Sequence, residues 1–198
     1  AILDGRDAPE KSAGEYLKKI EDKIKELELD EPLFEGGSAK ASIASMIGRY
    51  YAMDRDTNFD RTEKAYDLLA FGEGSEESDP YIALQNAYAS GAESDYYVPP
   101  IILEEHGVIK DKDAVIFWNF RTDRSRQLTW AFTGETPPKE TGLAEIGFKP
   151  RKIVRPFFVC LGPYSLDAPV VFPTEVIKNN LGEVLSTAGK KQLRISET

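Results

Sequence analysis

The sequence predicts an α/β fold in which a layered sheet carries helices on both of its faces. Short apolar runs typical of buried strands alternate with longer segments of helical periodicity, and glycine and proline mark the boundaries between them. Apolar residues make up 41% of the 198 residues, which is ordinary for a globular chain long enough to bury one sizeable core. Alternation of strands with helices is the pattern of α/β layered folds.

Four stretches are predicted to be strands, and the first residues read as the end of another. The run at 113–120 is the clearest, because it is apolar without interruption as far as Asn119. The other predicted strands are 41–48, 157–161 and 191–196.

Capping residues and periodic apolar positions predict the helices between these strands. Ser12 and Glu15 form a plausible capping box, Asp60 is placed to cap a second helix with Glu63 at N3, and Asp79 precedes a proline at the first helical position. The helical segments are expected at 13–27, 63–72, 80–91, 122–134 and 173–189. Between Thr133 and Lys152 several prolines and glycines predict a mobile surface loop.

Charge and composition argue against several classes of partner. The net charge of -9 would repel nucleic acid and anionic membranes, and no apolar run approaches the roughly 20 residues that span a bilayer. The first residues also lack the plan of a signal peptide, so the cytoplasm is the expected compartment. We expect the single cysteine, Cys160, to be an unreactive thiol in a buried strand.

The common catalytic signatures are absent from the sequence. It contains no Gly-rich phosphate loop, no GxGxxG after a strand, no GxSxG and no cysteine cluster. The single histidine, His106, lies among charged residues beside a glycine, so we expect an exposed turn there. One such histidine cannot build a zinc or manganese centre of several histidines, or a supported serine triad.

Arginines paired with aspartates follow three of the predicted strands. Because the carboxyl ends of strands in open α/β sheets converge on one crevice, these loops can share a ligand. The planar guanidinium fork matches carboxylate and phosphate oxygens, so a small phospho-acid is the natural guest. The residues concerned are Arg6 with Asp7, Arg49 with Arg55, and Arg121 with Arg124.

Two other interpretations of these loops stay open. The arginines and aspartates could be structural salt bridges that tie loops to the scaffold, as is common where both residue types occur together. They could also form a phospho-ligand binding module that carries out no chemistry in any context. Against the first interpretation, arginines gathered in three loops of an acidic protein favour a site that binds an anion.

Three long motifs, in order along the chain, carry a resemblance to a known family. They are LDGRD at 3–7 followed by P-x-K-S, IAS-x-x-GRYYAMDRD at 43–56 followed by an EKAYD segment, and DAVIFWNFRTDR at 113–124. Together they resemble the cofactor-independent phosphoglycerate mutases, two-domain enzymes of the alkaline phosphatase superfamily. The ending, 172–198, resembles the segment where those enzymes pass from the substrate domain back to the phosphatase-like domain.

The resemblance implies that the chain is part of an isomerase that interconverts 3-phosphoglycerate and 2-phosphoglycerate through a phosphoserine. Residues 1–168 would form the substrate-binding domain, without its N-terminal part, and 169–198 the connection to the phosphatase-like domain and the start of that domain. Asp7 would handle the substrate hydroxyl, and Thr122 stands where the family has alanine. The substrate-binding residues implied are Arg6, Asp7, Arg49, Arg55, Arg121 and Arg124.

The family's serine, metal-ligand, upstream histidine and lysine motifs have no counterpart in this sequence. The resemblance therefore implies that this chain binds no catalytic metal and is inactive alone. The parent enzyme would be a monomer that holds two Mn²⁺ ions or similar metals in its phosphatase-like domain, and that domain would be the partner of this chain.

Overall fold

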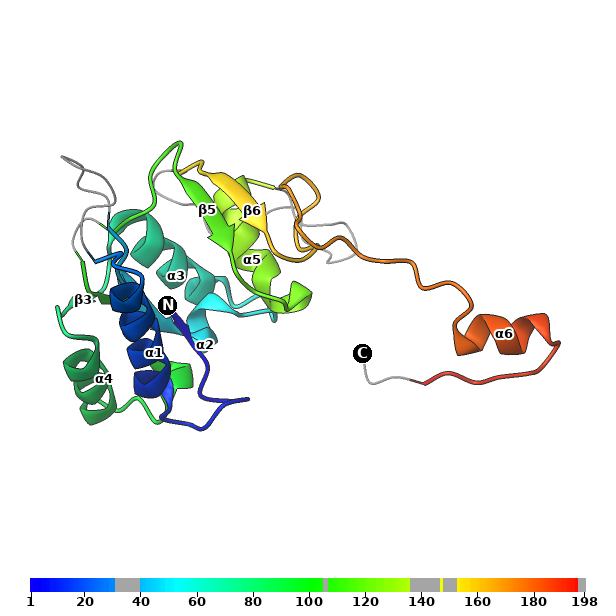
Figure 1. Cartoon of the computed structure of the whole chain (residues 1–198), viewed down its shortest axis with the longest axis horizontal. Helices are drawn as coiled ribbons and strands as arrows, with labels where there is room; N and C mark the ends of the chain where they lie inside the picture. Colours follow the sequence, from blue (N-terminus) through cyan, green and yellow to red (C-terminus); the bar gives the residue numbers. More distant parts are fainter. Residues whose placement is uncertain (31–39, 105–106, 136–146, 148–152, 196–198) are drawn as a thin grey trace.

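The computed structural model describes residues 1–30, 40–104, 107–135, 147 and 153–195 (Figure 1). Four strands form one sheet in the order β1-β2-β4-β3, and two further strands, β5 and β6, pair in parallel. The elements in chain order are β1 (Ile2–Leu3), α1 (Ala13–Glu26), β2 (Ser45–Gly48), α2 (Arg49–Ala52), α3 (Phe59–Phe71), β3 (Ser75–Glu76), α4 (Pro80–Ala89), the 3-10 helix η1 (Asp95–Tyr97), β4 (Ile101–Ile102), β5 (Ala114–Phe117), α5 (Thr122–Thr133), β6 (Phe157–Cys160) and α6 (Leu181–Thr187).

Helices cover both faces of the larger sheet, as the sequence predicts. Neighbouring residues of a strand point to opposite faces, and in β2 both Met46 and Ile47 are buried. Met46 packs in a cluster with Leu17 of α1 and Leu84 of α4. Ile47 belongs to the second cluster, which contains residues of α3, α5 and the β5–β6 pair. The two cores therefore lie on opposite sides of β2.

The start of α1 is held by a residue far away in the sequence. Asp95 is almost fully buried, and its Oδ2 accepts the backbone N–H groups of Ser12 and Ala13, each at 2.8 Å. The predicted capping box is wrong, because the Ser12 hydroxyl donates to the Pro9 carbonyl and caps no helical N–H. A tertiary carboxylate supplies the acceptor that the local motif was expected to supply.

Of the other predicted helix ends, some are confirmed by the structure and one differs from it. Asp79 accepts the N–H groups of residues 81 and 82 and precedes Pro80 at the first helical position, so that prediction is confirmed. The helix expected after Asp60 begins earlier, at Phe59, with Asn58 as the N-cap residue. Gly134 ends α5 in the left-handed conformation, close to the predicted end.

The last part of the chain runs away from the body and carries α6 (Figure 1). The helix expected at 173–189 is confirmed only over α6, and residues 191–195 of the predicted final strand are not in a strand. Both differences have one cause: residues 173–195 bury almost nothing against the described body, so no neighbour stabilises helix or sheet there.

Several other predictions concern single positions. Cys160 is fully buried in β6, so its predicted position in a buried strand is confirmed, and burial raises its pKa to about 11. His106 and nearly all of the loop predicted between 133 and 152 lie outside the described residues. Among the described helices, none is both long and apolar enough to cross a membrane.

Candidate functional site

Two glycines let three loops meet at the carboxyl ends of the strands. Gly5 follows β1 with a φ of 59°, and Gly48 ends β2. A Cβ atom on Gly5 would stand 2.4 Å from the Tyr96 nitrogen, and one on Gly48 would stand 2.2 Å from the Tyr96 carbonyl oxygen. Any side chain at either position would push η1 away, so both glycines permit the close approach that positions Asp4, Asp7 and Arg49.

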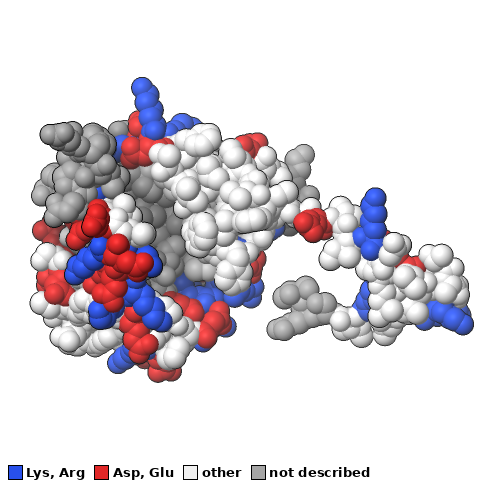
Figure 2. Space-filling view, viewed as in Figure 1, with Lys and Arg blue, Asp and Glu red and all other residues white. Residues whose placement is uncertain are grey.

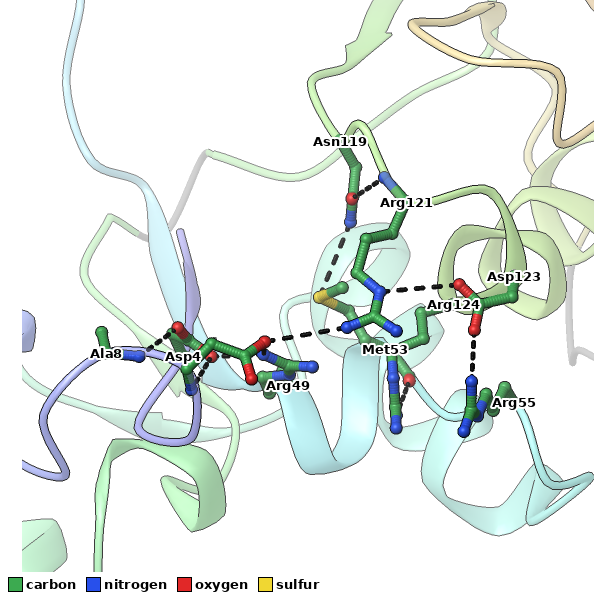
Figure 3. Close-up of polar contacts among 10 residues, drawn as sticks. Asp4, Ala8, Arg49, Met53, Arg55, Asn119, Arg121, Asp123 and Arg124 are labelled. Carbon is green, nitrogen blue, oxygen red and sulfur yellow. Dashed lines mark hydrogen bonds and ion pairs between the residues drawn. The ribbon is translucent and has the colours of Figure 1, made fainter. Parts of the chain in front are cut away.

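Arg49 is the buried centre of the site. It begins α2 directly after β2, and only 4% of its surface is exposed. Its Nη1 donates to Asp4 Oδ1 and, at 2.7 Å, to Asp7 Oδ2 (Figure 3). Asp4 also accepts the backbone N–H groups of Asp7 and Ala8, which folds the loop after β1 back toward the arginine.

A chain of ion pairs continues from Asp7 across the strand ends (Figure 3). Arg121, directly before α5, places Nη1 3.7 Å from Asp7 Oδ2 and Nε 3.6 Å from Asp123 Oδ1. Asp123 in turn accepts a 2.5 Å hydrogen bond from Arg55 Nη1. Loops that are far apart in sequence are thus joined through alternating charges, and Asp7, Arg49, Arg55 and Arg121 lie together at the strand ends.

Arg124 lies behind this chain and is buried among the same elements. Its Nη1 donates to the Met53 carbonyl oxygen at 3.0 Å, and 7% of the residue is exposed. The buried Nε atoms of Arg124 and Arg49 have no hydrogen-bond partner among the described residues. A buried guanidinium with an unused donor is costly, which distinguishes this arrangement from ordinary surface salt bridges.

The arginines set the protonation of the aspartates. Hydrogen bonding and charge attraction from Arg49, with a smaller contribution from Arg121, lower the pKa of Asp7. Partial burial acts to raise the pKa of Asp4, but its hydrogen bonds from Arg49 and from two backbone N–H groups outweigh burial and lower it. Both carboxylates are therefore ionised at neutral pH. Four guanidinium groups then face the three carboxylates of Asp4, Asp7 and Asp123, which leaves one unmatched positive charge.

A cavity of about 940 Å³ opens beside the cluster. Asp4, Asp7, Arg49 and Arg121 line its polar end, and the rest of the lining is mainly apolar. Arg6 lies elsewhere: it is exposed and lines a different, shallow pocket with Glu10 and Tyr96. The structure therefore brings five of the six predicted site residues together and leaves Arg6 outside the hydrogen bonds and ion pairs that connect the described residues of this cluster.

Three residues that support the site were not predicted from the sequence. Asp4 holds both Arg49 and the loop, and the Asn119 side chain accepts the backbone N–H of Arg121 at 2.9 Å. The buried Tyr164 hydroxyl donates toward the carbonyl groups of Phe117 and Asn119 at the end of β5. A signal existed for the first two, because both lie within the arginine motifs, Asp4 directly after β1 and Asn119 two residues after the end of β5. Nothing near Tyr164 in the sequence indicated its contact.

The described residues offer no metal site. No group of three or more histidine, cysteine, aspartate or glutamate side chains is gathered within the described ranges. The carboxylates nearest the cavity, those of Asp4 and Asp7, are paired with Arg49. The donor set of this part of the molecule therefore suits an anion and does not fit a divalent cation.

Fold and site together define a class: an α/β domain whose strand ends gather guanidinium groups and carboxylates beside a cavity. The chain belongs to the family described as BPG-independent PGAM N-terminus, whose model matches residues 1–165. It is 45% identical to 2,3-bisphosphoglycerate-independent phosphoglycerate mutase 1 of Methanosarcina acetivorans, 41% identical to the mutase of Desulforudis audaxviator and 42% identical to that of Escherichia coli O9:H4.

The chain spans about a third of the length of these relatives. Each alignment covers 100% of this chain and 36% of the relative. Among solved structures, a phosphoglycerate mutase of Leishmania mexicana, crystallised at low cobalt concentration, superimposes with a TM-score of 0.74 over 94% of this chain and 33% of that one. Sequence identity there is 23%, so this likeness supports the shared α/β fold alone.

Proposed function

We propose that this chain is the substrate-holding part of an enzyme that interconverts 3-phosphoglycerate and 2-phosphoglycerate. The chain itself supplies the glycerate- and phosphate-binding site, and it does not turn over alone. This role rests on the family and on one observation of the site. Arg49, which is buried and keeps a donor that the described residues leave unused, lines together with Arg121 a cavity that an anion can enter.

The arginines bind the carboxylate and phosphate oxygens of the substrate. A third of the Arg121 side chain is exposed, compared with 5% of that of Arg49, and the ion pairs of Arg121 at 3.6 and 3.7 Å are long. An arriving phosphate can displace such loose pairs at little cost. The buried side chains of Arg49 and Arg124 provide positive charge that is already fixed in place, so the three-carbon acid is oriented without reorganisation of the protein.

Asp7 orients the substrate hydroxyl that accepts the phosphoryl group. Because Arg49 and Arg121 lower its pKa, Asp7 is ionised but a weak base. The Asp7 side chain is 62% exposed and lines the cavity, within reach of a bound ligand. We place Arg6 in the same role as a substrate contact, which requires its exposed side chain to swing toward the ligand.

The remaining two thirds of the relatives' length supplies what this chain lacks. We propose that it contributes the nucleophile and two divalent metals, Mn²⁺ or similar, in a phosphatase-like domain of the same polypeptide, and that the whole enzyme is a monomer. Residues 1–168 form the substrate-binding domain and 169–198 the connection. We expect a cytoplasmic enzyme, in keeping with a single cysteine that is buried and reduced.

Calorimetric titration of the 198-residue chain with 3-phosphoglycerate tests the site. Arg121→Ala and Arg49→Lys should each weaken binding by about tenfold or more, since a charge-assisted hydrogen bond contributes about 1.5 to 3 kcal/mol. Lysine at position 49 keeps the charge that Asp4 and Asp7 need and removes only the planar fork.

The control for these variants is Arg126→Ala. Arg126 lies on α5 near the cluster, is exposed and takes part in none of the site's ion pairs, and its loss changes the net charge by the same amount as Arg121→Ala. Equal weakening by Arg121→Ala and Arg126→Ala would reduce the effect at Arg121 to general electrostatics, whereas Arg49→Lys leaves the net charge unchanged. No binding by the folded chain would favour the scaffold interpretation, and binding without mutase activity in the longer polypeptide would favour a pure binding module.

A further inference from the structure

We infer that the apolar part of the large cavity is the seat of one β-strand from the part of the polypeptide outside this chain. That strand would pair with β1 on one side and β5 on the other, joining the two sheets into one. The inference rests on membership of a family whose proteins are longer than this chain and on the geometry of the two strands. It does not depend on which substrate the site binds.

Both strands that border the cavity have one edge without a partner strand among the described residues. β1 is the end strand of the larger sheet, and β5 pairs only with β6. Ile47 donates its N–H to the Ala1 carbonyl, so Ala1 and Leu3 direct their backbone groups toward β2. The backbone groups of Ile2 between them must therefore point away from β2, toward the cavity that Ile2 lines.

The same alternation holds on β5. The carbonyls of Asp113 and Phe117 accept N–H groups from Phe157 and Leu161, so odd-numbered residues direct their backbone groups toward β6. The N–H and C=O of Ile116 then point to the opposite edge, which lines the cavity. Two rows of unused backbone groups thus border one cavity.

The two edges also run in matching directions. β1 is parallel to β2, β5 is parallel to β6, and the carboxyl ends of β1, β2 and β5 all lead into the arginine cluster. A single strand between them can therefore be parallel to both neighbours. The resulting sheet would run without a break from β2 to β1, then to the additional strand, and then to β5 and β6.

The cavity is too large and too apolar to be a solvent-filled gap in a finished core. At about 940 Å³ it could hold on the order of 30 waters at liquid density, whereas protein interiors leave few voids larger than one water. Its floor consists of core side chains, including Leu69, Leu128 and Phe132. A phospho-acid bound to the arginines would occupy only the polar end.

Exposed apolar side chains on β5 and directly after it indicate that more polypeptide packs here. Ile116 is 64% exposed and Trp118 81% exposed, and Figure 2 shows a largely uncharged surface over β5 and β6. Strands of parallel sheets are apolar on both faces because both faces are covered. The relatives contain nearly twice as much further chain as this one spans, which is ample to supply such a strand.

Amide hydrogen exchange, resolved by residue, tests the inference at two neighbouring positions. In the 198-residue chain the N–H of Ile116 should exchange rapidly, whereas that of Val115, directed toward β6, should be protected. In the longer polypeptide the Ile116 N–H should slow by about a hundredfold or more, to the level of Val115. Val115 is the matched control because its partner strand is present in both proteins.

Proline substitutions provide a second test of the inference. Ile116→Pro removes an N–H that has no partner strand in the 198-residue chain, so the free energy of unfolding of that chain should change little. Val115→Pro should lower the free energy of unfolding of both the 198-residue chain and the longer polypeptide. In the longer polypeptide Ile116→Pro should be destabilising as well. Rapid exchange at Ile116 in the longer polypeptide would overturn the inference. So would protection in the 198-residue chain accompanied by dimers in sedimentation, because a second copy would then cover the edge.

Discussion

Individual carboxylates, more than arginines, hold the loops of the site in place. Asp54, at the end of the GRYYAMD motif, is almost fully buried and accepts hydrogen bonds from the backbone N–H groups of Asp56 and Asn58 and from the Gln127 side chain. Arg61 lies 3.2 Å away. This one side chain therefore ties the loop after α2 to both α3 and α5.

Removal of the Asp54 carboxylate should be strongly destabilising. Asp54→Ala leaves a half-buried arginine and several buried donors without an acceptor, so the free energy of unfolding should fall by about 3 kcal/mol. Urea denaturation followed by circular dichroism measures this. Asp60→Ala, an exposed aspartate in the first turn of α3, is the control and should cost less than about 0.5 kcal/mol. Equal effects at the two positions would contradict the role assigned to Asp54.

Acid should destabilise the protein through the same residues. Burial acts to raise the pKa of Asp54, but its hydrogen bonds from Asn58 and Gln127 outweigh burial, and the pKa lies below 3.8. A carboxyl whose pKa is lower in the folded state stabilises that state above the unfolded pKa and loses the effect as pH falls through the folded value. The free energy of unfolding should therefore decline below about pH 4.

The Asp54→Ala variant identifies the source of this pH dependence. Its stability should decline less steeply below about pH 4 than that of the unsubstituted chain, because one of the carboxyls with a lowered pKa is gone. Denaturant titrations between pH 2.5 and 6 provide the comparison. Identical pH profiles for the two proteins would assign the acid effect to other groups, such as Asp4 and Asp123.

At the scale of elements, local sequence signals predicted most strands and helices, and tertiary contacts decided the rest. Uninterrupted apolar runs located β5 and β6, and Asp79 with Pro80 located α4. The cap of α1 could not be predicted, since Asp95 is more than 80 residues from the helix that it caps. The extent of α6 depends on packing that residues 173–195 do not have in this chain.

The site follows the same division. Arg49, Arg55, Arg121 and Arg124 were predictable because they follow strand ends, where topology alone brings loops together. The order of their pairing, and the displacement of Arg6 to another surface, depend on how the loop after β1 bends around Gly5. Residue type and spacing carry no information about that bend.

Two glycine substitutions test how tightly the elements are packed. Gly48→Ala would place Cβ 2.2 Å from a backbone oxygen of η1, so stability should fall by about 1–3 kcal/mol and the position of Arg49 should be disturbed. Gly14→Ala, inside α1, meets only ordinary contacts at 3.8 Å or more and should stabilise by about 0.5–1 kcal/mol. Thermal denaturation of both variants gives the comparison. A loss at Gly14 or none at Gly48 would contradict the packing described.

At the scale of the whole molecule, the body buries its own apolar side chains, whereas the final segment needs the rest of the polypeptide to cover its apolar side chains. The body has its own cores on both faces of β2. The segment after Phe172 exposes apolar side chains such as Val176 and Leu181 and buries none of its residues. These side chains should be covered only in the longer polypeptide.

Truncation of the 198-residue chain should therefore change its stability by very different amounts at two positions. Ending the chain after Phe172 should leave the free energy of unfolding within about 0.5 kcal/mol of the original, since nothing buried is lost. Ending it after Gly162 removes Tyr164, whose hydroxyl holds the ends of β5 and β6, and should cost several kcal/mol. Urea denaturation measures both. If the shorter deletion were as destabilising as the longer one, residues 173–195 would be part of the folded body, and the boundary between domain and connection would move toward the carboxyl end.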